Sequence, residues 1–431
     1  MIPERKVAIV TGANTGVGYA IVQRLVEESP NPLTVILACR NKGRAMEAKL
    51  SLEVHFATLL QKRRQIQEEY NKGSEKNNKR IEKENGTTKG SSRGTEFQKT
   101  AIDMDPKVEI SLVDVGSVNS VLEFNQRILQ QYPRIDYLFC NAGILPSDGI
   151  IWSKALIETF TAPMNLVVRS DVLRQPKQHL TQDGIGNVLA CNVFGHYVMI
   201  KGLESALNNT PEDPGRVIWT SSLTAEKANF DINDWQGLKA EQPYESSKWV
   251  TDMLAIRLNE MWGQQPAGTS SDVSSTTDST TVTKRMTRSA SKATHAEELK
   301  DNMNPSPTTT AVGPSERKNI ISITTQPGVV ASGIGGLAAW ITMIRIALHL
   351  MVRLMGESHQ TVTNYHGAYA NVYVALKPVE EINYRNKYGS GVTRLGYERL
   401  KVEKVVEYDE TQAEFVVDKM EKLRLSFTSS R

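Results

Sequence analysis

Residues 6–18 read KVAIVTGANTGVG, and this stretch decides the fold. Its first six residues form an apolar run of the kind that makes strands buried on both faces of a parallel sheet. Glycines at positions 12, 16 and 18 then let the backbone turn sharply into a helix, which we expect from about Val17 to Glu28. A strand, a glycine-rich turn and a helix in this order are typical of the first unit of a doubly wound sheet.

Five further apolar runs predict the other buried strands. They are Leu33 to Cys39, Val108 to Val113, Ile135 to Cys140, Arg216 to Thr220 and Asn319 to Thr324. Joined by right-handed crossovers, these strands give an α/β fold with a doubly wound parallel sheet of the Rossmann type in a single domain. We expect residues 1–333 to form the catalytic core, 334–356 an apolar helix, and 357–431 an extension that completes the fold.

Two polar stretches interrupt this pattern, at about residues 61–99 and 263–318. The first is rich in Lys, Glu, Asn and Gly, and the second in Ser and Thr. Such compositions bury too little apolar surface to offset the entropy lost on ordering, so we expect two disordered insertions.

Composition and charge narrow the class of protein. A formal net charge of +3 over 431 residues is too small to predict a nucleic-acid partner. Cys39, Cys140 and Cys191 each lie in an apolar run, which favours buried thiols in a reducing compartment over disulfides or metal ligands. No metal site is expected. The first residues lead directly into a strand, so we expect no cleaved signal peptide.

The glycine-rich turn predicts a nucleotide-binding site. Its glycines let the backbone approach a pyrophosphate, and the helix that follows points its free N–H groups at the anion. The alternative is a tight strand-to-helix turn without a ligand. The residues expected at the cofactor are Gly12, Asn14, Thr15, Gly16, Val17 and Gly18.

The end of the second strand distinguishes between cofactors. NAD sites usually place a carboxylate there, whereas this chain has Arg40 and no acidic neighbour. A guanidinium can grip a 2′-phosphate, which favours NADPH, although Arg40 could also be a plain surface residue. Asp114 after the third strand is a candidate partner for the adenine amino group, or simply a turn residue.

Tyr244 and Lys248 form the candidate catalytic pair. They lie four residues apart at the start of a long helical pattern, so they share one helix face. A neighbouring ammonium favours the phenolate, so we expect Lys248 to lower the pKa of Tyr244, and it can also hold the nicotinamide ribose. Ser221 and Ser222 end a buried strand upstream, and one of them can donate to a substrate carbonyl oxygen.

Two amide-bearing segments complete the predicted site. Asn141, Ala142 and Gly143 follow the fourth strand at its carboxyl end, where open α/β sheets bind cofactors. Asn192 lies in an apolar, helical stretch, and a buried Asn needs partners that a kinked helix or a bound water can supply.

The set TGANTGVG, NAG, Asn192, Ser-Ser and YESSK resembles the short-chain dehydrogenase/reductase family over residues 6–328. The resemblance implies a catalytic tetrad of Asn192, Ser222, Tyr244 and Lys248, with Asn192 maintaining a water relay. It also implies that Pro327, Gly328 and Val329 close over the nicotinamide. The serine and tyrosine lie further apart than is usual in that family, so the choice of Ser222 over Ser221 is left open.

The stretches YLFCNAG (137–143), NVFG (192–195), YESSK (244–248) and KYGS (387–390) are similar to fungal 3-keto-steroid reductases of sterol C-4 demethylation. This resemblance implies NADPH-dependent reduction of a C-4 demethylated 3-ketosterol to its 3β-alcohol in ergosterol synthesis. It further implies the cytosolic face of the endoplasmic reticulum or lipid droplets, with other sterol C-4 demethylation enzymes as candidate partners. The long helices around Asn192 and Tyr244 leave a homodimer open.

Residues 334–356 are long and apolar enough to raise the question of a membrane helix. Arg345, His349 and Arg353 recur every four residues and form one polar stripe. We therefore expect a helix in the plane of the membrane interface, with arginines near the headgroups, that acts as anchor and substrate portal. A buried lid or a dimer helix is the alternative.

Other functions fit parts of the pattern. A hydroxysteroid or retinoid dehydrogenase would use the same residues in the opposite direction, and an NADPH-binding scaffold would need only the cofactor site. All four catalytic side chains are present, which favours an enzyme. Apolar residues between Gly143 and Asn192, including Ile150, Trp152 and Phe160, predict either a wall of an extended substrate pocket or an extra surface helix.

Overall fold

The computed structural model describes residues 4–85, 105–161, 172–264, 317–330, 339–405 and 408–429. Within them, eight strands form one sheet in the order β3-β2-β1-β4-β5-β6-β7-β8, parallel except for the antiparallel pair β7–β8. The predicted doubly wound parallel sheet is confirmed. The strands are β1 (Lys6–Thr11), β2 (Leu33–Cys39), β3 (Lys107–Leu112), β4 (Tyr137–Cys140), β5 (Gly215–Thr220), β6 (Ile320–Gln326), β7 (Asn386–Val392) and β8 (Glu398–Lys404).

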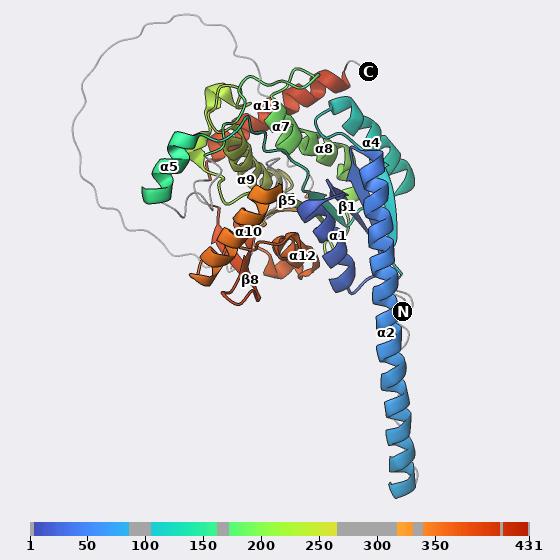
Figure 1. Cartoon of the computed structure of the whole chain (residues 1–431). Helices are drawn as coiled ribbons and strands as arrows, with labels where there is room; N and C mark the ends of the chain where they lie inside the picture. Colours follow the sequence, from blue (N-terminus) through green and yellow to red (C-terminus); the bar gives the residue numbers. More distant parts are fainter. Residues whose placement is uncertain are drawn as a thin grey trace, which may run out of the picture.

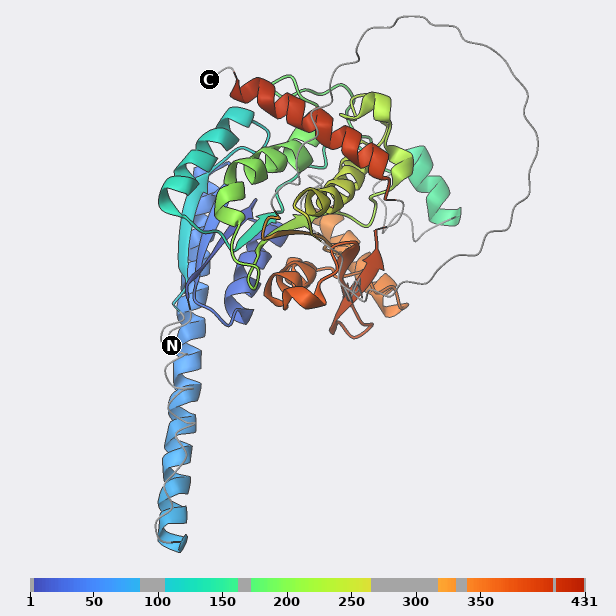
Figure 2. The ribbon, with the colours of Figure 1, turned by 180° about the vertical axis from the view of Figure 1, so that it is seen from behind.

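Helices cover both faces of the sheet (Figures 1 and 2). On one face, α1, α2 and α12 share a buried apolar cluster with the strands; on the other, α4, α8, α9 and α13 do so. The helices are α1 (Gly16–Glu28), α2 (Lys42–Asn85), α4 (Val118–Gln131), α5 (Trp152–Thr161), α7 (Asn187–Leu189), α8 (Gly195–Leu207), α9 (Pro243–Met261), α10 (Ala339–Leu354), α11 (Asn364–Gly367), α12 (Tyr369–Leu376) and α13 (Glu410–Thr428). A π-helical turn, Ala190–Phe194, joins α7 to α8, and single 3₁₀ turns span Lys227–Asn229, Ile232–Asp234 and Val379–Glu381.

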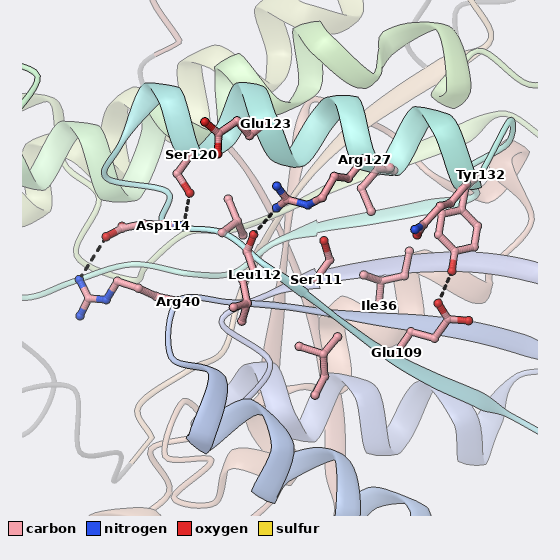
Figure 3. A pocket seen from close by; sticks show the side chains of 14 residues that line it. Ile36, Arg40, Glu109, Ser111, Leu112, Asp114, Ser120, Glu123, Arg127 and Tyr132 are labelled. Atoms are coloured by element: carbon pink, nitrogen blue, oxygen red, sulfur yellow. Dashed lines mark hydrogen bonds and ion pairs between the residues drawn. The ribbon is translucent and has the colours of Figure 1, made fainter.

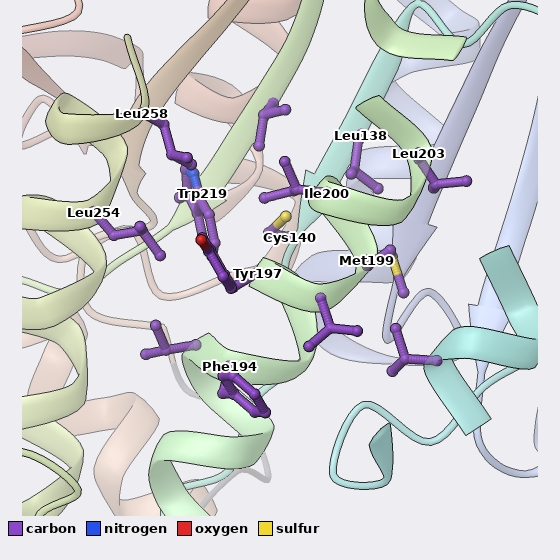
Figure 4. Close-up of a cluster of buried hydrophobic side chains, with 14 of the residues drawn as sticks. Leu138, Cys140, Phe194, Tyr197, Met199, Ile200, Leu203, Trp219, Leu254 and Leu258 are labelled. Carbon is purple, nitrogen blue, oxygen red and sulfur yellow. The ribbon is translucent and has the colours of Figure 1, made fainter. Parts of the chain in front are cut away.

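The α8–α9 side holds the larger aromatic core (Figure 4). Trp219 at the end of β5 is fully buried between these helices, and its indole N–H donates to the Ser322 hydroxyl on β6 at 3.0 Å. Tyr197, which lies beside Trp219, and Phe194 are likewise buried. Because buried aromatic rings permit little movement, this packing fixes α8 and α9 against the carboxyl ends of β4 and β5.

Helix α2 departs from the expected disorder over residues 61–85. Its first turns pack on the sheet through Ala45, Ala48, Leu52 and Phe56, and the remainder projects from the domain as a rod (Figure 1). The polar stretch is rich in Lys, Glu, Gln and Arg, which favour helix even where nothing is buried. Residues 86–99 of that insertion, and 265–316 of the second, lie outside the described residues.

Helix α13 covers α9 from outside (Figure 2). Its buried residues Ala413, Val416, Val417 and Met420 belong to the same core cluster as α9. The Tyr197 hydroxyl donates to Glu421 at 2.9 Å and ties α13 to α8 as well. This face of α9 is thus packed against the chain's own helix.

Candidate active site

The backbone of the glycine-rich turn is sharply bent and closely packed against its neighbours. Gly12 and Gly16 have φ of +67° and +62°, values that disfavour any residue with a side chain. A Cβ on Gly18 would lie 2.4 Å from the Gly12 carbonyl oxygen and 2.6 Å from Asn141 Nδ2. Helix α1 begins at Gly16, after Asn14 and Thr15, and points its first N–H groups out of this turn toward the ends of the strands. The glycine cradle therefore fits a dinucleotide pyrophosphate.

Thr11 holds this turn to the segment after β4. Its hydroxyl oxygen accepts hydrogen bonds from the backbone N–H groups of Asn141 and Ala142, each at 2.9 Å. The same oxygen lies 2.9 Å from Nε2 of His196, which is fully buried. Burial lowers the pKa of His196 to about 3, with the Lys248 ammonium acting in the same direction, so its ring is neutral at physiological pH. No role was predicted for His196, because the sequence does not show that this residue of α8 lies against Thr11.

Arg40 and Asp114 stand together at the carboxyl edge of β2 and β3. Their side chains approach to 3.7 Å, and the Arg40 side chain is 70% exposed. Both lie at one end of a pocket of about 500 Å³ that runs along β3 beneath α4 (Figure 3). An exposed guanidinium beside the cofactor turn is free to bind a phosphate. Asp114 also accepts from the backbone of Gly116, as in the turn alternative.

Tyr244, Ser222 and Lys248 meet at the start of α9. The Lys248 ammonium is buried, lies 5.5 Å from the centre of the Tyr244 ring and donates to the Thr220 carbonyl at 2.8 Å. Ser222 faces Tyr244, and its hydroxyl accepts from the Thr224 backbone at 3.2 Å. Ser221 instead points into the fold and donates to the Lys248 carbonyl at 3.3 Å. The geometry therefore favours Ser222 as the serine that can reach a substrate.

The ionisation of this cluster differs from the expectation. Burial raises the pKa of Tyr244 to about 12, the neighbouring Glu245 acts in the same direction, and only the Ser222 hydroxyl opposes them. Burial also lowers the pKa of Lys248 to about 8, which Asp252 opposes and Lys387 reinforces. The pKa of Tyr244 is thus raised in this structure and not lowered as expected, because burial has the largest effect. The phenol is protonated at neutral pH, the state that a proton donor requires.

Asn192 is satisfied by the protein itself. Its Oδ1 accepts from the backbone N–H of Ile144 at 2.7 Å, and its Nδ2 donates to the Ile144 carbonyl and to the Ser247 hydroxyl. It lies in the π-helical turn Ala190–Phe194, an interruption of the kind expected for a buried Asn in an apolar helix. A Cβ on Gly143 would lie 2.9 Å from Asn192 Oδ1. The side chain therefore ties the segment after β4 to α9.

A second buried amide, Gln175, was not predicted from the sequence. Gln175 is buried, and its Oε1 accepts from the Tyr244 backbone N–H at 2.9 Å. Its Nε2 donates to Gln242 and Glu245, so Gln175 caps the start of α9. The strand-like pairing of residues 148–151 with 172–174 places it there, and α5 projects from the same segment (Figure 1). No local sequence pattern marks such a long-range cap.

The loop after β6 is held in a sharp turn. Gly328 has a φ of +70°, and a Cβ there would lie 2.6 Å from the His359 carbonyl oxygen. Val329 donates to His359 at 2.7 Å, and the Thr361 hydroxyl donates to the Pro327 carbonyl at 2.9 Å. The segment that follows α10 therefore fixes the position of this loop.

Helix α10 exposes apolar side chains and buries one member of the expected polar stripe. His349 is buried, with its Nδ1 2.8 Å from Gln360 Oε1, and Val352 is buried beside it. The apolar side chains of Met343, Leu348, Met351, Leu354 and Met355 are exposed instead. His349, one member of the expected polar stripe, therefore faces the protein interior, where Gln360 is its partner. No helix in the described part of the chain is long and apolar enough to cross a membrane.

The structure shows the state of the three cysteines and of the possible metal ligands. Cys39, Cys140 and Cys191 are free and buried, and burial raises the pKa of each. Among the described residues, no group of three or more His, Cys, Asp or Glu side chains is arranged to hold a metal ion.

The proteins to which this chain is similar include 3-keto-steroid reductases. It is 26% identical over 422 residues to the rat (Rattus norvegicus) 3-keto-steroid reductase/17-beta-hydroxysteroid dehydrogenase 7, covering 95% of this chain and 92% of that protein. It is 24% identical over 405 residues to the 3-keto-steroid reductase erg27 of Schizosaccharomyces pombe, covering 92% and 89%. No family model matches the chain.

Among solved structures, the chain resembles an NADPH-bound short-chain oxidoreductase from Pseudomonas aeruginosa PAO1. The TM-score is 0.46 and the identity 11%, over 88% of this chain and 92% of that one. A structural similarity at this level supports no argument about function.

Proposed function

We propose that this chain, a short-chain dehydrogenase/reductase homologous to the 3-keto-steroid reductases, uses NADPH to reduce the 3-keto group of a C-4 demethylated sterol to its 3β-alcohol, as in ergosterol synthesis. The observation that carries the proposal is the meeting of Tyr244, Ser222 and Lys248 beside the glycine cradle. A phenol, a hydroxyl and an ammonium at one point are what carbonyl reduction needs.

The cofactor would be held by residues already described. Gly12, Gly16 and Gly18 would admit the pyrophosphate, Arg40 would bind the 2′-phosphate, and Lys248 the nicotinamide ribose. Asn141, Ala142, Gly143 and the 327–329 turn would border the nicotinamide. When bound, NADPH supplies the hydride that reduces the carbonyl carbon.

The chain's own residues would bind and protonate the carbonyl oxygen. Ser222 donates a hydrogen bond to this oxygen as negative charge develops on it. Tyr244, protonated because burial raises its pKa to about 12, transfers its proton to the oxygen. The resulting phenolate is stabilised by the nearby Lys248 ammonium. Asn192 and Gln175 hold the surrounding backbone in place.

The test is NADPH oxidation at 340 nm with a 3-ketosterol supplied in lipid vesicles. Tyr244→Phe should lower kcat by about 10²–10⁴-fold, the usual worth of a positioned proton donor. Tyr70→Phe, an exposed tyrosine on the outer part of α2, is the matched control and should leave turnover unchanged. Equal turnover by wild type and Tyr244→Phe would rule out the catalytic role.

Cofactor choice is tested in the same assay. Arg40→Asp should raise the KM for NADPH by about 10–100-fold, the value of charge-assisted hydrogen bonds, and should change the KM for NADH much less. An unchanged ratio of the two KM values would show that Arg40 is only a surface residue.

A second activity is favoured by the name of the rat relative, which includes a 17-beta-hydroxysteroid dehydrogenase. We therefore include a 17-ketosteroid as a parallel substrate. If the 17-ketosteroid is turned over faster than the 3-ketosterol, the 17-ketosteroid replaces the 3-ketosterol as the proposed substrate.

We also propose that the enzyme works at the cytosolic face of the endoplasmic reticulum membrane or on lipid droplets, near other enzymes of sterol C-4 demethylation. In support, Met351, Leu354 and Met355 on α10 are 53%, 62% and 69% exposed. Leu395 and Tyr397, in the turn between β7 and β8, are 80% and 70% exposed. A Cβ on Gly396 in that turn would lie 3.6 Å from Arg353, so the turn and α10 form one apolar surface edged by arginine.

Sedimentation with vesicles tests this membrane contact. Met351→Glu with Leu354→Glu should reduce the bound fraction, as should Leu395→Glu. Leu50→Glu, an exposed leucine on α2, is the control and should bind as wild type does. If the α10 variant and the turn variant both sediment with vesicles as wild type does, these residues do not anchor the protein to the membrane.

A further inference from the structure

A buried ion pair lies directly behind the catalytic residues. The Lys387 ammonium on β7 donates to Asp252 Oδ2 on α9 at 2.7 Å, and their side chains are 10% and 5% exposed. Burying two charges costs several kcal/mol per ion before their attraction is counted, so apolar residues of similar volume would often serve stability as well. Stability alone therefore does not explain why a buried ion pair lies at this position.

A second contact of Lys387 supplies that reason. The same ammonium donates to the backbone carbonyl of Ser222 at 2.6 Å. Asp252 lies one helical turn beyond Lys248 on α9, and Lys387 reaches it from the neighbouring strand. One cation thus joins β7, α9 and the segment that follows β5.

We propose that Lys387, paired with Asp252, is a positioning residue of the active site: it fixes the backbone of Ser222 and sets the charge around Lys248. Lys387 touches neither substrate nor cofactor in this role. The proposal rests on the proposed function, because it concerns the residues that carry out that reaction.

The charge effect follows from what surrounds Lys248. The titratable groups facing it are Tyr244 and Asp252 on its own helix, Lys387 on β7 and the neutral His196 on α8. Lys387 disfavours the Lys248 ammonium and lowers its pKa, whereas Asp252 favours the ammonium and raises it. Removing one member of the pair should therefore shift the titration of Lys248 in one direction, and removing the other should shift it in the opposite direction.

The experiment compares Lys387→Met with Asp252→Asn. For each, NADPH affinity by fluorescence and kcat/KM for the ketone are measured from pH 6 to 10. Because Lys248 must be charged to hold the ribose and the phenolate, both quantities should fall as it deprotonates. The alkaline fall should move to higher pH in Lys387→Met and to lower pH in Asp252→Asn, each by about one pH unit.

The backbone contact gives an independent readout. Loss of the hydrogen bond to the Ser222 carbonyl should lower kcat of Lys387→Met at pH 7 by about 10-fold or more, while the KM for NADPH changes little. Lys387→Arg keeps a cation and should restore part of this kcat. Lys422→Met breaks an exposed ion pair of the same 2.7 Å length on α13 and is the control for losing a lysine.

Folding is checked by thermal unfolding, with Lys387→Met/Asp252→Leu as the variant that leaves no unpaired charge. This double variant should fold, should titrate near wild type and should keep the low kcat. Shifts in the same direction in both single variants, or no shift in NADPH affinity, would overturn the proposal. If wild type reduces no steroid ketone, the proposed function fails, and the NADPH titrations still test the ion pair.

Discussion

Replacing Lys248 by Met should stabilise the fold while it abolishes turnover. The Lys248 ammonium is buried and has one hydrogen-bond acceptor, the Thr220 carbonyl. Its pKa falls from an ordinary 10.5 to about 8, a lowering of about 2.5 pH units. At 1.36 kcal/mol per unit, the charged form costs the folded state about 3 kcal/mol. Methionine keeps the length of the side chain and removes this cost.

The sign of the pH dependence follows from that lowered pKa. The cost is fully present below pH 8, where Lys248 is charged in both folded and unfolded chains. Between pH 8 and 10.5 only the unfolded chain holds this proton, so raising the pH stabilises wild type relative to Lys248→Met. Above pH 10.5 the side chain is neutral in both states and the cost is gone.

Urea unfolding, followed by tryptophan fluorescence, measures the free energy of unfolding of both proteins at pH 7 and pH 10.5. The variant lacks a donor to Thr220, which lowers its stability at every pH, so the informative quantity is the change in the difference between the two proteins. We expect that difference to move by about 3 kcal/mol in favour of wild type. A difference that does not change with pH would refute the reasoning that the site buries a charged lysine at the expense of stability.

Two further substitutions test the surroundings of the cofactor turn. His196→Gln should make the fold less sensitive to acid. The pKa of the buried imidazole is lowered from 6.5 to about 3, so wild type loses stability as the pH falls through that window, about 5 kcal/mol in all and about 3 kcal/mol by pH 4. Unfolding free energies of the two proteins at pH 7 and pH 4 measure this, and equal losses would contradict it. Gly18→Ala should weaken NADPH binding at least about 10-fold and destabilise the fold by about 1–3 kcal/mol, because its Cβ would meet the backbone of Gly12. A fluorescence titration that gave wild-type affinity would show that the close approach is not required.

The sheet was predictable where its strands are buried on both faces. The six apolar runs expected from the sequence are β1 to β6, with ends that differ by one or two residues. Strands β7 and β8 were not predicted. The first contains Gly389 and Gly391, which are rare in strands, and the second, ERLKVEK, is a polar edge strand. Their place in the sheet comes from tertiary pairing.

The members of the candidate site were predictable from their order along the chain, but their environment was not. The pKa of Tyr244 depends on burial and on Glu245, which spacing does not reveal. The role of Lys387 depends on the pairing of β7 with β6, and the inward orientation of His349 depends on Gln360. Such contacts between distant residues are set by packing.

The cover that α13 provides for α9 bears on how the chain folds during synthesis. Helix α13 begins about 150 residues after α9 ends, and β7, which carries Lys387, also follows a long separation. Until those segments have emerged from the ribosome, the outer apolar surface of the helix that carries Tyr244 has nothing to pack against. Closing loops of this length is slow, and exposed apolar surface promotes aggregation in the meantime. The apolar surface of α9 that α13 covers therefore stays exposed until α13 has been synthesised and has folded back onto it.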